Sequence, residues 1–302
     1  MKTIVSVSIG SSSRDHEVEI DLMGEHFLIR RQGTDGDISK AMDILHQLDG
    51  QVDAIGLGGL DIYLRCGRDK YALRDGKIMM DSVKKTPVVD GSGLKDTLER
   101  VTIEALQADG RISVRDRKVL IVSAMDRFGL AEAMIQAGAN VIFGDMIFAM
   151  GIDKPLRSLK QLSHYAKRLL PDLSRLPMSM LYPTGTKQNI IEPSELTNPY
   201  YREAEIIAGD FHFIRRRMPP RLDGKTIITN TVTAADIEEL RQRGVSWLAT
   251  TTPELQGRSF GTNVMEALFI SILGKKWDEV VPDDYLRLIK QLDFKPRIEK
   301  LH

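Results

Sequence analysis

The segment from Val119 to Asp145 has residue types and spacing that are typical of a nucleotide-binding unit. A buried apolar run ends at Ser123, and the turn after it leads into a predicted helix that begins at Phe128. A helix N-terminus offers unpaired N–H groups and a partial positive charge, which suit a phosphate. Asp145 ends the next predicted strand, about 20 residues after Ala124, which is the spacing at which an acidic residue binds a ribose hydroxyl. An acidic residue there favours NAD over NADP.

The glycines that usually line such a turn are mostly absent. Aligned on G-x-G-x-x-G, the chain has Ala124, Asp126 and Gly129, so only the third glycine remains. The second glycine normally lets the backbone approach a pyrophosphate. Asp126 puts a negative charge at that position, although Arg127 could offset it. The alternative that this βαβ unit binds nothing therefore stays open.

Three later strands are predicted to end in short polar segments, at residues 209–212, 230–233 and 250–253. Ligands of open α/β sheets bind outside the carboxyl ends of the strands, so we expect these segments to lie along one edge. Their hydroxyl and amide groups suit a ribose, a nicotinamide or a substrate, but residues of these types also cap helices. His212 is a candidate substrate contact, with a structural role as the alternative. The predicted cofactor contacts are Ser123, Ala124, Asp126, Arg127, Phe128, Gly129, Asp145, Asn230, Thr231 and Thr251.

Strand-like and helix-like patterns alternate along the chain, which indicates βα units and a largely parallel sheet. We expect an α/β fold with an N-terminal α/β substrate domain and a Rossmann-like doubly wound parallel sheet. The domains are predicted at residues 1–110 and 111–258, with C-terminal helices over 259–302 that pack back on the first domain. The strands of the second sheet are predicted at 118–123, 140–143, 178–182, 205–208, 226–229 and 246–249.

The composition narrows the class of partner. The chain has 302 residues, more than one compact core usually holds. Its 42 Lys and Arg balance 42 Asp and Glu, which argues against a nucleic-acid partner, because such a partner requires a basic surface. No stretch approaches the roughly 20 apolar residues of a membrane helix, and the apolar run at 4–9 is too short for a signal peptide. We expect a cytoplasmic protein with a small-molecule partner and no membrane partner, and a homodimer stays open.

Metal and disulfide chemistry have no sequence support. The single cysteine, Cys66, cannot form an internal disulfide, and we expect it to be buried in the core as a small apolar side chain. No H-E-x-x-H motif occurs, and the six histidines are scattered. We therefore expect no metal site.

Two segments carry a resemblance to a known family. Residues 87–94 read Pro-Val-Val-Asp-Gly-Ser-Gly-Leu and precede a predicted helix, which resembles the N-T-D-G-x-G segment of shikimate and quinate dehydrogenases. Residues 261–269 read Gly-Thr-Asn-Val-Met-Glu-Ala-Leu-Phe, similar to that family's G-x-x-M-L-x-x-Q-A helix. The whole chain also resembles bacterial proteins that carry the name quinate 5-dehydrogenase.

This resemblance implies an NAD(P)-dependent oxidoreductase that acts on the alcohol of a quinate- or shikimate-like hydroxy acid. Asp90 falls on the family's catalytic aspartate, with a plain turn aspartate as the alternative. Glu266 falls at or near a glutamine that contacts substrate. The family's N-V-T-x-P-x-K segment is not recognisable, so Lys85 is the candidate lysine for the proton transfer. Ser11 and Ser12 follow the first strand, where the family has an S-x-S pair that holds the substrate carboxylate.

Two other functions stay open at this point. The first is a non-catalytic nucleotide- or metabolite-binding protein on the same fold, which the loss of two glycines and of the lysine segment favours. The second is a transferase that binds a phosphorylated ligand at the glycine-rich turn of residues 56–61. No helix with a clear N-cap is predicted after that turn, which argues against the transferase.

Overall fold

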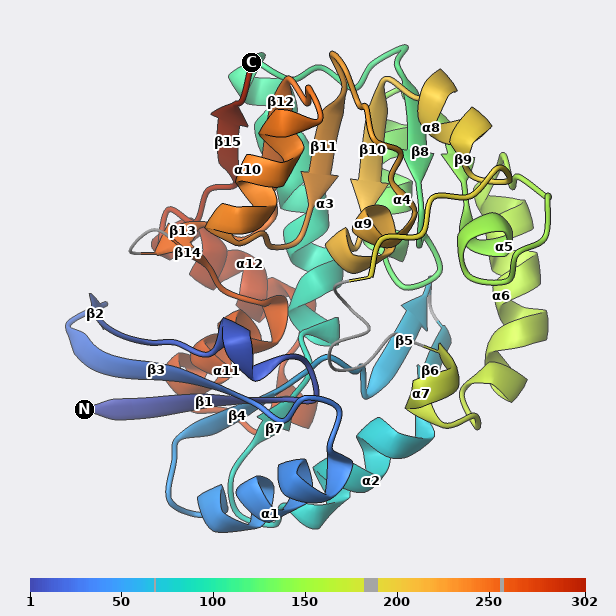
Figure 1. The fold of residues 1–302 in the computed structure, drawn as a ribbon. Coiled ribbons are helices and arrows are strands. Elements are labelled where there is room, and N and C mark those ends of the chain that lie inside the picture. Colours follow the sequence, from blue (N-terminus) through green and yellow to red (C-terminus); the bar gives the residue numbers. More distant parts are fainter. Residues whose placement is uncertain (68, 182–189, 256–257) are drawn as a thin grey trace.

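A computed structural model describes residues 1–67, 69–181, 190–255 and 258–302. The chain forms two sheets, the first in the lower half of Figure 1 and the second in the upper half. The first sheet has five strands in the order β2 (Glu17–Leu22), β3 (Glu25–Gly33), β1 (Lys2–Ser8), β4 (Ala54–Gly58) and β7 (Val88–Val89). Neighbours are parallel except for the antiparallel pair β2–β3.

Helices cover both faces of the first sheet. Side chains on alternate faces of β1 show this directly, because successive residues of a strand point to opposite sides. Val5 and Val7 pack in the cluster that includes α1 (Ile38–Leu48) and α2 (Arg74–Ser82), whereas Ile4 packs in the cluster that includes α11 (Thr262–Leu273) and α12 (Pro282–Gln291). Two helices from near the C-terminal end of the chain, α11 and α12, therefore cover one face of the first sheet.

The second sheet is also covered on both faces and is mostly parallel. Its order is β15 (Arg297–Lys300), β12 (Trp247–Thr250), β11 (Thr226–Thr229), β10 (Ile206–Gly209), β8 (Lys118–Ile121) and β9 (Asn140–Phe143). Only β15 runs antiparallel, beside β12. The helices associated with this half are α4 (Phe128–Gln136), α5 (Asp145–Phe148), α6 (Leu159–Leu173), α7 (Met178–Leu181), α8 (Asn198–Glu203), α9 (Phe211–Arg217) and α10 (Ala234–Gln242). The predicted α/β class with a doubly wound parallel sheet is confirmed.

One strand predicted for the second half was wrong, and one strand of the sheet was not predicted. Residues 178–181 form α7 rather than a strand, and Tyr182 lies outside the described residues. The sixth strand of the sheet is instead β15, whose pairing with β12 could not be seen locally. The segment 230–233 does cap a helix, as the residue types allowed, since Thr233 and Asp236 exchange hydrogen bonds in a capping box.

The helix α3 (Ser92–Asp109) connects the two halves. It contacts α11 and α12 beside the first sheet and α4 beside the second. Gly129 allows the α3–α4 contact, because a Cβ at that position would lie 2.6 Å from the Asp96 carbonyl oxygen. Two short hairpins complete the structure, β5 (Tyr63–Cys66) with β6 (Asp69–Ala72) and β13 (Glu254–Leu255) with β14 (Arg258–Ser259), together with the 3₁₀ turns η1 (Ser12–Arg14) and η3 (Trp277–Glu279). Within the described ranges, no helix has the length and apolar character that crossing a bilayer requires.

Candidate functional site

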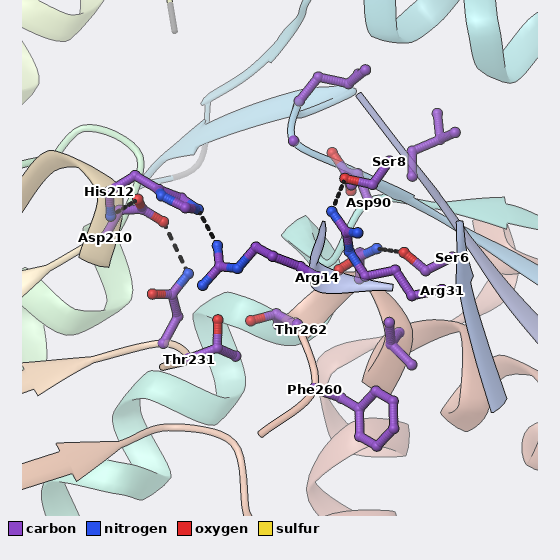
Figure 2. Close-up of a pocket in the computed structure, with 18 of the residues that line it drawn as sticks. Ser6, Ser8, Arg14, Arg31, Asp90, Asp210, His212, Thr231, Phe260 and Thr262 are labelled. Carbon is purple, nitrogen blue, oxygen red and sulfur yellow. Dashed lines mark hydrogen bonds between the residues drawn. The ribbon is translucent and has the colours of Figure 1, made fainter. Parts of the chain in front are cut away.

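A cavity of about 200 Å³ lies where the carboxyl ends of the two sheets face each other (Figure 2). Ser8 and the turn 58–61 reach it from the ends of β1 and β4, and the segments after β8, β10 and β11 reach it from the second sheet. Parallel sheets bind ligands at this edge, where helix N-termini and loops converge. We call this cavity the cleft, and its charged and polar side chains are Ser6, Ser8, Arg14, His16, Arg31, Asp61, Asp90, Lys95, Asp126, Arg127, Asp210, His212, Asn230, Thr231, Thr233, Thr262 and Asn263.

Lys95 joins carboxylates from the two halves of the molecule. Its Nζ lies 2.7 Å from Asp126, which follows β8, and 3.4 Å from Asp61, which follows β4. Burial lowers the pKa of Lys95, but the two carboxylates raise it by more, so the ammonium stays protonated. Burial and the nearby Asp126 raise the pKa of Asp61 to about 7. At neutral pH Asp61 can therefore donate a hydrogen bond as well as accept one.

Arg127 is enclosed beside the cleft by three acidic side chains, of which Asp126 lies 3.9 Å from its Nε. Its side chain is 4% exposed, and its guanidinium lies 2.5 Å from Glu99 and 3.0 Å from Asp210. Burial raises the pKa of Asp210, but Arg127, the neighbouring His212 with its backbone N–H, and Lys95 together lower it by more, to about 2. Among the described residues, Arg127 Nε has no hydrogen-bond partner.

Arg14 connects the first domain to the second across the cleft. Its Nη1 lies 3.0 Å from His212 Nε2, and its Nη2 lies 3.1 Å from Asp236. A guanidinium only donates, so His212 accepts through Nε2 and is neutral, with its proton on Nδ1. Burial lowers the pKa of His212, which agrees with this neutral form. The predicted substrate contact His212 therefore lines the cleft and also carries a contact between the domains.

Hydroxyl groups of β1 are held in place by neighbouring donors. Asn263 Nδ2 donates to Ser6 Oγ at 2.9 Å, and Arg31 donates to Ser8 Oγ at 3.0 Å. Asn263 lies close because β4 carries Gly56, where a Cβ would come within 2.7 Å of the Asn263 carbonyl oxygen. Gly56 thus allows α11 to approach β4, whereas the 58–61 part of the turn lines the cleft.

The turn predicted to bind a nucleotide phosphate is filled by the chain's own carboxylate. Asp145 Oδ1 accepts a hydrogen bond from the Met125 N–H at 2.7 Å, and both residues are buried. Asp145 therefore caps the turn from inside and does not face a sugar. Burial raises the pKa of Asp145 to about 7, although the backbone N–H groups of the turn oppose the shift.

The substitution Asp145→Asn tests this position through pH. The native pKa of about 7 exceeds the ordinary value of 3.8, so the folded state holds the proton more tightly than the unfolded state does. Asp145 therefore stabilises the fold fully below its unfolded-state pKa of 3.8, and this stabilisation is lost as pH rises through its folded-state pKa of about 7. The asparagine side chain of the variant still offers an acceptor to Met125 but does not titrate. We expect the free energy of unfolding of the wild type, relative to the variant, to fall between about pH 4 and about pH 7 in urea titrations. A constant difference would contradict a buried Asp145.

The predicted site residues divide into those in the cleft and those elsewhere. Asp126, Arg127, Asn230, Thr231, His212 and Asp90 line it. Ser123, Ala124, Phe128, Gly129, Asp145 and Thr251 do not, because they pack in the interior or carry backbone contacts. Ser11 pairs with Ser13, and Ser12 pairs with Asp35, both outside the lining. Glu266 lies in a separate cavity.

The predicted catalytic pair of Asp90 and Lys85 does not form. Lys85 is exposed and precedes β7, where its N–H binds Asp49, whereas Asp90 follows the same strand at its other end. The Asp90 carboxylate accepts from the N–H groups of Ile62, Tyr63 and Ser92 at 2.5–2.9 Å. The turn-aspartate alternative thus describes Asp90. No sequence motif identified Lys95, although a lysine four residues before Glu99 on the buried face of a helix was a visible signal.

Comparisons with known proteins identify the family. Residues 93–301 match the domain of unknown function DUF8754, and residues 3–90 match the domain of unknown function DUF8753. The chain belongs to the DUF8754 family. No curated protein matches this family member.

Several solved structures resemble this DUF8754 protein at low identity. GanP, a glucose-galactose binding protein from Geobacillus stearothermophilus, is 9% identical over 99% of this chain and 97% of its own, with a TM-score of 0.39. A substrate-binding protein of a sugar ABC transport system from Bordetella parapertussis 12822 is 12% identical over 90% and 79%, with a TM-score of 0.35. The NAD-dependent malic enzyme from Thermotoga maritima is 15% identical over 82% and 65%, with a TM-score of 0.31.

The prediction that this chain is an NAD(P)-dependent oxidoreductase of quinate or shikimate type was wrong. Sugar-binding proteins recur among the matched structures. Because their TM-scores are low, these matches show only a similar arrangement of helices and strands. In the DUF8754 protein itself, Asp145 fills the predicted phosphate turn and Lys85 lies away from Asp90. Binding of NAD and a cytoplasmic location stay predictions.

Proposed function

We propose that the cleft binds a small, neutral, polyhydroxylated metabolite and releases it unchanged. One observation carries this proposal: the cleft is lined from both sheets by acidic and basic side chains in equal number. Four of the lining residues described are basic, Arg14, Arg31, Lys95 and Arg127, and four are acidic, Asp61, Asp90, Asp126 and Asp210. Balanced charge favours a neutral ligand, because an ion of either sign would meet like charges as it enters.

Polar groups of both kinds match the chemistry of a polyol. Each hydroxyl donates one hydrogen bond and accepts two, so it needs donors and acceptors side by side. Asp61 and Asp126 lie beside Lys95, and Arg127 Nε still lacks an acceptor among the described residues. A ligand oxygen near Arg127 would supply that acceptor.

An apolar surface and the size of the cleft limit the ligand further. The rings of His16 and Phe260 pack with centroids 4.6 Å apart and both line the cleft, which suits the C–H face of a sugar or cyclitol ring. The volume of about 200 Å³ is below the roughly 300–1,000 Å³ of pockets for drug-sized ligands. A single ring therefore suits the cleft better than a dinucleotide.

The state of the polar groups supports binding rather than turnover. Lys95 is protonated between its carboxylates, and His212 already accepts a hydrogen bond from Arg14. Ser6 and Ser8 accept from Asn263 and Arg31, and such donors make a hydroxyl oxygen less nucleophilic. None of these groups is arranged as a nucleophile beside a free base.

The test is a thermal-shift panel followed by calorimetry. The panel contains neutral monosaccharides and cyclitols, quinate and shikimate, and NAD and NADP. We expect a neutral member to raise Tm, because a ligand of the folded state stabilises it by mass action. A response to the hydroxy acids or dinucleotides alone, or conversion of the ligand seen by mass spectrometry, would refute the proposal.

Two threonines of one segment provide a matched pair of variants. Thr231 follows β11 and lines the cleft, whereas Thr226 begins the same strand at its opposite end. We expect Thr231→Val to weaken binding of the ligand about tenfold, the value of one lost hydrogen bond. Thr226→Val should leave the Kd unchanged in the same calorimetric titration. Equal effects of the two variants would place the ligand elsewhere.

A further inference from the structure

A second cavity of about 190 Å³ lies apart from the proposed ligand site. It is enclosed by the β5–β6 hairpin, the start of α3, η3 and α12, and it shares Asp90 with the cleft. The side chains that matter for its chemistry are Tyr63, Lys70, Glu266, Trp277, Asp278 and Tyr285. The function proposed above makes no use of this cavity.

Two aromatic rings at this cavity already hold an ammonium group. Tyr63 and Trp277 face each other with centroids 6.1 Å apart and planes inclined by 28°. The Nζ of Lys70 lies 3.5 Å from the Tyr63 centroid and 5.3 Å from the Trp277 centroid. The faces of tyrosine and tryptophan attract cations, and clusters of such rings recognise alkylammonium ligands in proteins.

Acidic groups line the same cavity. Glu266 is 4% exposed, and its two oxygens accept hydrogen bonds from the Gly91 N–H and the Tyr285 hydroxyl, each at 2.6 Å. Asp90 and Asp278 also line the cavity, against the cations Arg65 and Lys70. If the Lys70 ammonium moved out of the cavity, Arg65 would be the one remaining lysine or arginine among the described lining residues, against three acidic side chains.

The position of Lys70 allows its ammonium group to move away from the two rings. It is exposed, and it belongs to β6, which pairs only with β5 in a two-stranded hairpin. A lysine is a compact charge on a flexible stem, so its ammonium can turn from the rings to solvent without a change in the core.

We propose that this cavity binds a small organic cation with an alkylammonium head group, which replaces the Lys70 ammonium against the faces of Tyr63 and Trp277. Lys70 then acts as an internal competitor for the ligand. The cation–π faces supply selectivity for positive charge, and the acidic lining supplies long-range attraction. Asp90 is the lining residue that both cavities share, and the rings that would bind the cation do not line the cleft, so failure of this site would leave the proposed function untouched.

The experiment uses the full-length protein and choline chloride as the probe, with 3,3-dimethylbutan-1-ol as its neutral isostere. We expect calorimetry to show that choline binds Lys70→Ala about tenfold more tightly than it binds the wild type, because the competitor is removed. The isostere should bind Lys70→Ala at least about tenfold more weakly than choline does. Lys84→Ala is the control, because Lys84 is exposed and lies outside the cavity, and it should behave as the wild type.

A second variant tests the rings themselves. Trp277→Leu should abolish choline binding in the Lys70→Ala background, with its fold checked by circular dichroism. If that variant does not fold, Tyr63→Leu takes its place with the same expectation. No choline binding to Lys70→Ala, or equal affinity for choline and its isostere, would overturn the proposal.

Discussion

Arg127→Met is expected to lower the free energy of unfolding by about 3–5 kcal/mol, because it leaves buried carboxylates without their counterion. Glu99 is 1% exposed and depends on Arg127 for charge neutralisation. Burial already raises the pKa of Glu99 to about 7, despite the guanidinium. Urea denaturation at neutral pH measures the loss.

Two further variants show whether the buried charge is the cause. Adding Glu99→Gln to Arg127→Met should recover part of the loss, since the protein then buries one ionisable carboxyl group fewer. Arg221→Met is the matched control, because Arg221 is 67% exposed and pairs with the exposed Asp223; such pairs contribute about 0–1 kcal/mol. If Arg127→Met costs no more than Arg221→Met, the buried network does not stabilise the fold as described.

Lys95→Met is expected to weaken binding of the cleft ligand about 100-fold. The Lys95 ammonium holds Asp61 and Asp126 in position on the two sides of the cleft. Without it, these two carboxylates repel each other and lose the geometry in which they meet a ligand. Calorimetry with the ligand found in the thermal-shift panel measures the change in Kd.

The controls for this prediction are a variant of a lysine outside the cleft and a variant of an acidic partner of Lys95. Lys85→Met removes an exposed lysine outside the cleft, so it should bind the ligand as the wild type does. If Lys95→Met proves unstable, Asp61→Asn tests the same cluster, because it leaves Lys95 and the helix α3 intact. This variant should also weaken binding of the ligand. Full affinity in both Lys95→Met and Asp61→Asn would show that the ligand binds outside this cluster.

The strands that sequence patterns predicted well are buried runs with helices on both sides. The run 118–121 illustrates this, because three of its four residues are buried in the centre of a parallel sheet. The run at 178–182 has a similar apolar character but is too short to distinguish helix from strand, and its described part is helical. The strand β15 reads Arg-Ile-Glu-Lys and has little apolar signal. It exists because the edge of β12 offers unpaired backbone groups.

Two residues of the predicted nucleotide site show how one pattern can serve another purpose. Gly129 stands where the third glycine of a dinucleotide fingerprint stands, and here it allows α4 to approach α3. Asp145 has the spacing of a ribose-binding acid, and here it binds the Met125 N–H. In both cases the local requirement, a small residue or an acceptor near a helix N-terminus, is the same for packing and for ligand binding.

The sequence by itself determined the α/β class, the alternation of strands and helices, the cap at Thr233 and the polar character of the strand ends, because each depends on neighbours within a few residues. Only the tertiary structure decided which polar side chains meet. Lys95, Asp61 and Asp126 come from three separate segments, and their contact depends on how α3 crosses between two sheets. Burial in that contact then decides which group keeps its proton, because the cost of a buried charge depends on the partners that surround it.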